Sequence, residues 1–139
     1  ALDGPLQAFR DLYAEAEVTL SVNWDKKVHG SIGPRVQTNP DVLQQALGPV
    51  LENALHWVQE RAKGRRVTIE LKSNSLSVIN NGPPVLTADV PHLFDAHFTR
   101  RQDRPGMGLF LSRSLIATVG GSLSYAENRK RPEFTVRFG

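Results

Sequence analysis

The strongest pattern in the chain is the helical spacing of apolar residues between positions 38 and 64. Leucine, valine and alanine recur there every three or four residues, which places them on one face of an α-helix. Asn39 is a residue type that caps helices, Pro40 fits the first helical position, and Gly64 is a typical stop. The pattern therefore predicts a long amphipathic helix that ends at Gly64.

Two shorter segments share this helical spacing, and several others alternate between apolar and polar residues. Residues 4–18 predict a helix, and so do residues 106–121, which end in a Gly-Gly pair. Alternation is typical of half-buried strands, and a short polar turn between two such runs indicates a hairpin. The predicted strands are residues 18–24, a weaker candidate at 30–38, a hairpin within 65–80 around "KSNS", and a closing hairpin of 122–127 with 133–139.

These elements do not alternate strictly between helix and strand, which favours an α+β fold. We expect a two-layer sandwich in which helices cover one face of a mixed, mostly antiparallel sheet. The connection over residues 80–106 has little periodicity of its own. Connections of this length in compact domains are usually functional or disordered.

Composition narrows the class of protein. A chain of 139 residues, with 40% hydrophobic and 22% charged residues, is typical of one globular domain. It has no apolar run that could span a bilayer and no signal-peptide pattern, so we expect a cytoplasmic domain. The absence of cysteine excludes disulfides and thiolate metal sites. The net charge of +3 is mild, and the basic runs at 61–66 and 129–131 lack interleaved aromatic residues. We therefore interpret them as solvated loop charge rather than a nucleic-acid patch, and expect no nucleic-acid partner.

Three segments carry candidate chemistry, and each has a plain structural explanation as well. Asn53 lies at the edge of the apolar stripe in "LENAL"; its amide oxygen suits Mg²⁺, although a polar residue at a helix boundary needs no such role. Gly82 in "NNGPP" permits close approach to the backbone, as does the glycine of an ordinary turn. Gly106 and Gly108 frame a predicted helix start, where backbone N–H groups attract phosphate, but a short Gly-x-Gly is weak evidence alone.

The order and spacing of the motifs are more specific than any one of them. From about residue 38 to the C-terminus, "LENAL", a hairpin, "NNGPP", "LFDAHFTRR" and "GMGLFLSRSLIATVGG" follow one another. This arrangement resembles the GHKL ATPase superfamily, and more narrowly the catalytic ATP-binding domain of bacterial sensor histidine kinases. The resemblance implies a Bergerat-type fold over the single domain 1–139, with ATP and Mg²⁺ as cofactors. It also implies transfer of the γ-phosphate to a histidine on another domain or chain, with a response regulator as a further partner.

The resemblance assigns roles to residues of the long helix and of the hairpin's end. Asn53 would bind Mg²⁺, with Glu52 beside it assisting phosphoryl transfer, and His56 would contact phosphate. Asn80 and Gly82 would occupy the segment that reads the adenine amino group.

The later segments receive roles in the same way. Arg100 and Arg101 would lie at the root of a lid over the nucleotide, after Phe94 and Phe98. The triphosphate would lie at the glycine-rich helix start, which comprises Gly106, Gly108 and Leu109.

The sequence also departs from the family's pattern. Pro49 and Pro84 replace an asparagine and a glycine, His97 replaces a phenylalanine, and Asn80 replaces an aspartate. No histidine lies in the context of a phosphoacceptor helix. A degenerate relative that acts as a signalling or interaction module with weak or no nucleotide binding therefore stays an alternative, as does a serine kinase of the anti-sigma type or another GHKL ATPase.

The amide at Asn80 has a predictable effect on nucleotide recognition. It can still accept a hydrogen bond through its oxygen, but without the charge of an aspartate, which costs about 1 kcal/mol, or about tenfold or less in affinity. Flipped, its NH₂ group could donate to the O6 atom of guanine, which an aspartate would repel. We therefore expect weaker discrimination between adenine and guanine than an aspartate would give.

Overall fold

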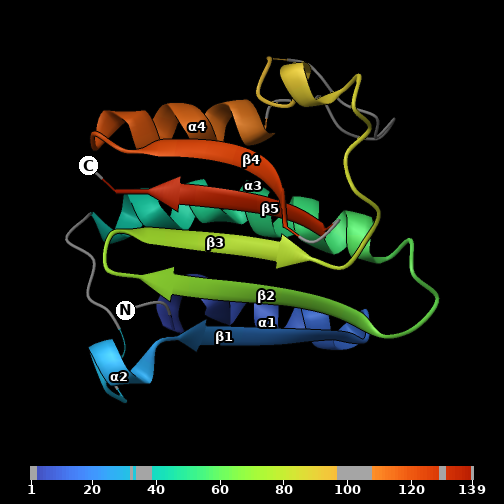
Figure 1. The fold of residues 1–139 in the computed structure, drawn as a ribbon, viewed down its shortest axis with the longest axis horizontal. Coiled ribbons are helices and arrows are strands. Elements are labelled where there is room, and N and C mark those ends of the chain that lie inside the picture. Colours follow the sequence, from blue (N-terminus) through green and yellow to red (C-terminus); the bar gives the residue numbers. More distant parts are fainter. Residues whose placement is uncertain (1–2, 32, 34–38, 97–107, 129–130, 139) are drawn as a thin grey trace.

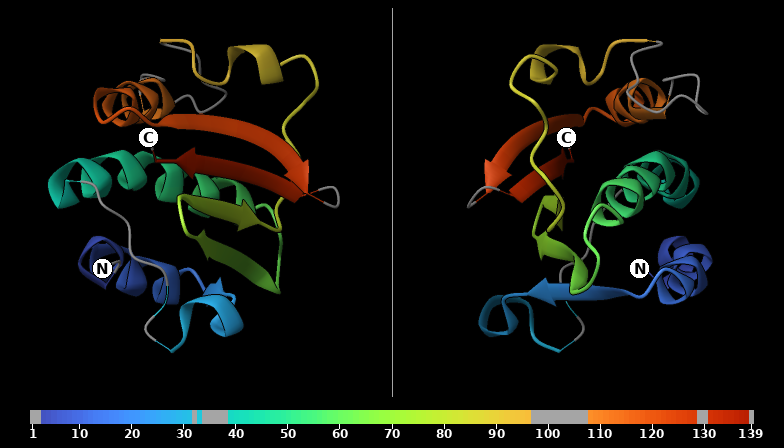
Figure 2. Two further views of the ribbon diagram at one scale, coloured as in Figure 1. Left: turned by 60° about the vertical axis from the view of Figure 1, so that its left-hand side comes forward. Right: turned by 90° about the vertical axis from the view of Figure 1, so that its right-hand side faces the viewer.

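A computed structural model describes residues 3–31, 33, 39–96, 108–128 and 131–138. Within these residues, a five-stranded sheet has the strand order β1-β2-β3-β5-β4. Figures 1 and 2 show α1, α3 and α4 together on one face of the sheet, which confirms the two-layer α+β prediction. The elements are α1 (Asp3–Glu15), β1 (Val18–Trp24), α2 (Lys26–His29), α3 (Pro40–Val58), β2 (Arg65–Lys72), β3 (Ser75–Asn80), the 3-10 helix η1 (Val90–His92), α4 (Gly108–Thr118), β4 (Ser122–Asn128) and β5 (Arg131–Arg137).

The sheet is mixed because one of its strand pairs is parallel. β1 pairs with β2 in parallel, and α3 provides the crossover between them, whereas β2–β3, β3–β5 and β4–β5 are antiparallel. The predicted hairpins of residues 65–80 and of the C-terminus are both present. β3 is therefore the central strand, and it carries the chain into the loop that follows Asn80.

The core lies between the sheet and α3. Val50, Leu51, Ala54 and Val58 of this helix are completely buried, as its apolar stripe predicts. The opposite face of the sheet is polar, and the hydroxyls of Ser77 and Thr135 lie 2.9 Å apart on it. A sheet with one apolar and one polar face needs only one layer of helices.

The structure corrects the predicted end of the long helix. α3 begins at Pro40, where the Asn39 side chain accepts hydrogen bonds from Asp41 and Val42 N–H, but it ends at Val58 rather than at Gly64. Turns follow, and the guanidinium of Arg65 donates to the carbonyl oxygens of Gln59 and Arg61. The carbonyls after the helix are thus bonded by a side chain rather than by another helical turn.

Two other boundaries differ from the prediction. The first helix ends at Glu15, since Val18 already pairs with Arg65 in the sheet. Gly30 and Ser31, at the start of the weak strand candidate, lie in a turn after the unpredicted α2, and most of that segment lies outside the described residues. None of the helices in the described part of the chain is both long and apolar enough to cross a membrane.

Candidate functional site

The candidate site is built along one side of α3. Pro49, Asn53 and Trp57 are four residues apart in this helix, so they follow one another along the same side at intervals of about 6 Å. All three are half-buried. Asn53 therefore lies midway between two positions at which other segments can contact the helix.

The start of α4 contacts α3 at the first of these positions. A Cβ atom placed on Gly108 would lie 3.2 Å from Cβ of Pro49, so the two helices are close enough to favour glycine. One turn further along α4, the buried Ser112 hydroxyl donates to the carbonyl oxygen of Ala46 at 2.7 Å. These two contacts fix the start of α4 beside the turn of α3 that precedes Asn53.

The loop after β3 contacts α3 at the other position. A Cβ atom placed on Gly82 would lie 2.5 Å from the carbonyl oxygen of Trp57 and 2.9 Å from Oδ1 of Asn80. Gly82 is absent from the positive-φ glycines of the described chain, so space rather than backbone conformation requires glycine here. In Figure 1 this loop, the C-terminal part of α3 and the start of α4 lie at the same end of the sheet.

The side chain of Asn80 is held in one orientation by the loop. It is 1% exposed, and its Oδ1 accepts a hydrogen bond from the N–H of Gly82 at 2.9 Å. Its Nδ2 is buried without a hydrogen-bond partner. The sequence leaves both orientations of this amide open; in the structure the oxygen already has a donor, and the unsatisfied group is the NH₂.

The neighbouring asparagine is bonded through both its oxygen and its NH₂ group, and it fixes the base of the loop. Asn81 Oδ1 accepts from Arg66 N–H at 2.8 Å, and its Nδ2 donates to the carbonyl oxygen of Gly64 at 2.7 Å. Further along, Val85 N–H donates to the hydroxyl of Tyr125 at 3.2 Å. The loop is thus held at both ends, by β2 at one and by β4 at the other.

The aromatic residue predicted after the loop also has a fixed place. Phe94 packs edge-on against Phe134 of β5, with ring centroids 6.2 Å apart, and the guanidinium of Arg113 lies 4.8 Å from the centroid of the Phe94 ring.

The pKa of the Tyr125 phenol is raised above its ordinary value. Burial is the main cause, the hydrogen bond from Val85 N–H lowers the pKa in part, and the charge of Glu127 raises it further.

The polar residues beside Asn53 provide the remaining chemistry. Glu52 and His56 are both half-buried, and the His56 ring lies edge-on to Trp57 with centroids 5.0 Å apart. Within the described residues no three histidine or carboxylate side chains form a metal cluster. Mg²⁺ does not require such a cluster, because it retains waters and takes one or two protein oxygens beside substrate phosphates. The amide oxygen of Asn53 fits that requirement.

The structure brings together only part of the predicted set. Three of the predicted residues, Glu52, Asn53 and His56, lie in the C-terminal half of α3. Gly82 and Gly108 contact this helix at Trp57 and Pro49, and the Asn80 side chain is bonded to Gly82. Leu109 is half-buried and packs against the core. Arg100, Arg101 and Gly106 lie outside the described residues, as do His97 and Phe98.

Two residues with structural roles were missed from the sequence, one that bonds the segment after α3 and one that bonds the loop after β3. Arg65 belongs to a basic run interpreted as solvated, yet its guanidinium donates to carbonyl oxygens of Ala16, Gln59 and Arg61. The only sign of these bonds in the sequence is that Arg65 lies at the start of a predicted strand. Tyr125 lies in a hairpin strand, and nothing in the pattern relates it to Val85.

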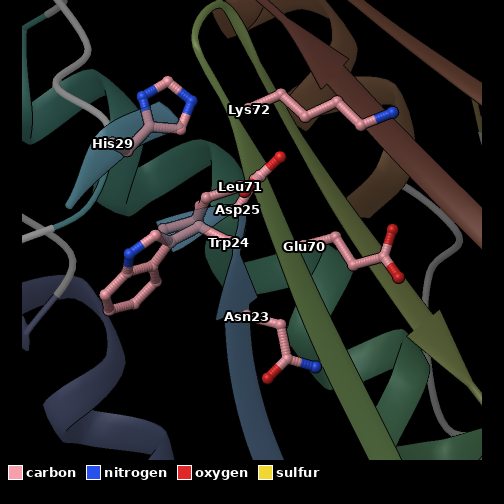
Figure 3. A pocket seen from close by; sticks show the side chains of 7 residues that line it. All are labelled: Asn23, Trp24, Asp25, His29, Glu70, Leu71 and Lys72. Carbon is pink, nitrogen blue, oxygen red and sulfur yellow. The ribbon is translucent and has the colours of Figure 1, made fainter. Parts of the chain in front are cut away.

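A separate hollow of about 250 Å³ lies beside β1 and β2 (Figure 3). It contains none of the candidate site residues, so it is not the predicted site. Its lining residues are Asn23, Trp24, Asp25, His29, Glu70, Leu71 and Lys72.

Comparison with known proteins gives a consistent family. The profile of the histidine kinase-, DNA gyrase B- and HSP90-like ATPases matches residues 38–139. Among curated proteins, the chain is 27% identical over 94 residues to the sensor histidine kinase ZraS of Salmonella typhi, covering 64% of this chain and 20% of that protein. It is 28% identical over 120 residues to the sensory histidine kinase/phosphatase NtrB of Rhizobium leguminosarum, covering 74% and 31%. The chain thus spans about a fifth to a third of these relatives.

Solved structures share the fold. The catalytic domain of histidine kinase ThkA superposes with a TM-score of 0.77 at 21% identity, covering 97% of this chain and 87% of that one. The mycobacterial sensor histidine kinase MprB gives a TM-score of 0.75 at 20% identity, covering 99% and 90%. ThkA in complex with the response regulator protein TrrA gives 0.73 at 20% identity, covering 97% and 38%.

Proposed function

We propose, because the chain belongs to the family of histidine kinase-, DNA gyrase B- and HSP90-like ATPases, that it is the ATP-binding catalytic domain of a two-component sensor histidine kinase. It would bind ATP with Mg²⁺ and transfer the γ-phosphate to a histidine on another domain or chain. A response regulator would then be the next partner, as TrrA is in the complex with ThkA.

One observation carries the proposal. The loop after β3 and the start of α4 both contact the side of α3 that bears Asn53, at Trp57 and at Pro49 respectively. A nucleotide in this region would have its base near Asn80 and Gly82 and its phosphates near the start of α4, with Asn53 between them. A helix start supplies unpaired N–H groups and a positive dipole end, which favour phosphate.

Each residue would then have a defined task. The Asn53 amide oxygen would hold Mg²⁺, which neutralises phosphate charge, and the phosphate would be oriented by Gly108 N–H and by His56. Glu52 would orient the acceptor imidazole. Arg100 and Arg101, with Gly106, would add positive charge and backbone donors over the phosphates. Phosphoryl transfer depends mainly on such positioning and charge stabilisation.

Titration with a fluorescent ATP analogue tests the proposal. The native chain should bind it saturably with Mg²⁺ and weakly without, and Asn53→Ala should remove the Mg²⁺ dependence. Asn23→Ala is the matched control, because Asn23 is an exposed asparagine on β1, away from α3. The absence of binding at millimolar nucleotide would favour a degenerate module, for which Asn80, Pro49 and Pro84 are the sequence arguments.

A further inference from the structure

The orientation of the Asn80 amide carries an inference about which base the site accepts. The N–H of Gly82 can only donate, so the atom that faces it at 2.9 Å must be the amide oxygen. This assigns the NH₂ group to the other side, where it is buried without a partner. Buried polar groups without partners are rare in native proteins and call for an explanation.

We propose that this NH₂ group reads a hydrogen-bond acceptor on the base, so that the site takes 6-oxopurine nucleoside triphosphates, GTP and ITP, alongside ATP. The inference rests on the proposed nucleotide-binding function. Guanine and hypoxanthine offer the O6 carbonyl to the donor, and adenine offers its ring nitrogen N1. The amide oxygen keeps a second lone pair for the neighbouring N–H of either base.

An aspartate at this position would behave differently. It presents only acceptors when ionised, so it pairs with the adenine amino group and repels O6. The amide has no such repulsion, and its NH₂ gains the partner that it lacks. Asn80 is 1% exposed, so a hydrogen bond between a base and this amide is shielded from water. In such surroundings an unmatched donor or acceptor is penalised most strongly.

The adjacent Asn81 provides a matched control. It is the same residue type in the same loop, but both ends of its amide are already bonded, to Arg66 N–H and to the carbonyl of Gly64. Asn81→Asp therefore adds the same charge in the same loop and also loses the bond to Gly64, because a carboxylate has no donor. The ratio of the affinities for different bases in this variant controls for both changes, since the Asn80 amide is kept.

The test is a competition of ATP, GTP and ITP against a fluorescent nucleotide with Mg²⁺, in the native chain, in Asn80→Asp and in Asn81→Asp. We expect native dissociation constants for GTP and ITP within about tenfold of that for ATP, and in Asn80→Asp a loss of at least about tenfold for both relative to ATP. Asn81→Asp should keep the native ratios. ITP lacks the 2-amino group of guanine, so agreement between ITP and GTP assigns the effect to O6.

The opposite results are equally clear. A native chain that binds ATP more than about tenfold better than GTP or ITP overturns the inference. An Asn80→Asp variant whose affinities for GTP and ITP relative to ATP equal the native ones overturns it as well. Either leaves the ATP-binding function standing. The native ratios decide alone if Asn80→Asp fails to fold, and a native chain that binds no nucleotide removes both proposals.

Discussion

The backbone of Gly82 lies directly against the carbonyl oxygen of Trp57, so close that a Cβ atom there would be 2.5 Å from it. Gly108, the first residue of α4, lies against Pro49, which precedes Trp57 in α3 by about two turns. Segments that are 26 residues apart in the sequence, at positions 82 and 108, thus use α3 as a common support. The predictions below follow from this arrangement and from the bonds that maintain it.

Replacing Gly82 by alanine should destabilise the protein and weaken nucleotide binding. The new Cβ meets backbone atoms of α3, which cannot move without shifting the helix, and overpacking of this kind costs about 1–3 kcal/mol. Urea unfolding measures the stability change, and the fluorescent-nucleotide titration measures the binding. A variant with native stability would show that the loop does not depend on this contact.

Gly48→Ala is the matched control for that substitution. A Cβ atom at Gly48 of α3 would have an ordinary contact of 4.0 Å with the Phe9 ring, and alanine is a better helix former than glycine. We expect the stability to rise by about 0.5–1 kcal/mol, with nucleotide affinity unchanged.

Arg65 should contribute more to stability than a surface arginine does. Its guanidinium bonds the carbonyls of Ala16, Gln59 and Arg61, so Arg65→Ala should cost about 1–3 kcal/mol in urea unfolding. Arg65→Lys should recover little, because an ammonium cannot span three carbonyls. The exposed Arg66 is the control, and Arg66→Ala should stay within about 0.5 kcal/mol of native. Equal losses for the two alanine variants would contradict the assignment.

The buried Tyr13 should make stability depend on alkaline pH. Its hydroxyl donates to the carbonyl of Leu51 at 2.7 Å, and burial raises its pKa well above the ordinary value of 10.0. Above pH 10 the unfolded chain loses this proton while the folded chain keeps it, so stability should fall there by about 1.4 kcal/mol per pH unit.

Tyr13→Phe separates this effect from other alkaline titrations. At pH 8 the variant should be less stable by about 0.5–1.5 kcal/mol, because it lacks the hydrogen bond. As the pH rises above 10, the native chain alone pays the added ionisation penalty, so the two unfolding free energies should converge and then cross. Parallel curves through pH 11 would exclude Tyr13 as the source.

The sequence predicts the fold well where periodicity is strong. The apolar stripe of α3, its Asn39–Pro40 start and the two antiparallel hairpins all follow from local pattern. The end of α3 could not be predicted, since it depends on the Arg65 side chain bonding the carbonyls that follow the helix, and the apolar pattern carries no sign of that contact.

In the candidate site, too, some features can be predicted from the sequence and others depend on tertiary contacts. The resemblance to the GHKL ATPases groups Asn53, Gly82 and Gly108 as a set, but their common support on α3 is a tertiary property. The orientation of the Asn80 amide depends on one backbone N–H two residues away. The sequence leaves both orientations open, because an amide can donate or accept on either side.

The most direct test of the central claim is paramagnetic line broadening by Mn²⁺ bound with nucleotide in place of Mg²⁺. If these segments line one site, the backbone amide signals of Asn53, Gly82 and Gly108 should all broaden, and that of Asn23 on β1 should not. A Mg²⁺–nucleotide sample provides the diamagnetic reference. Broadening that is confined to one of the three, or that is strongest beside Asn23, would contradict the claim that they form a single nucleotide site.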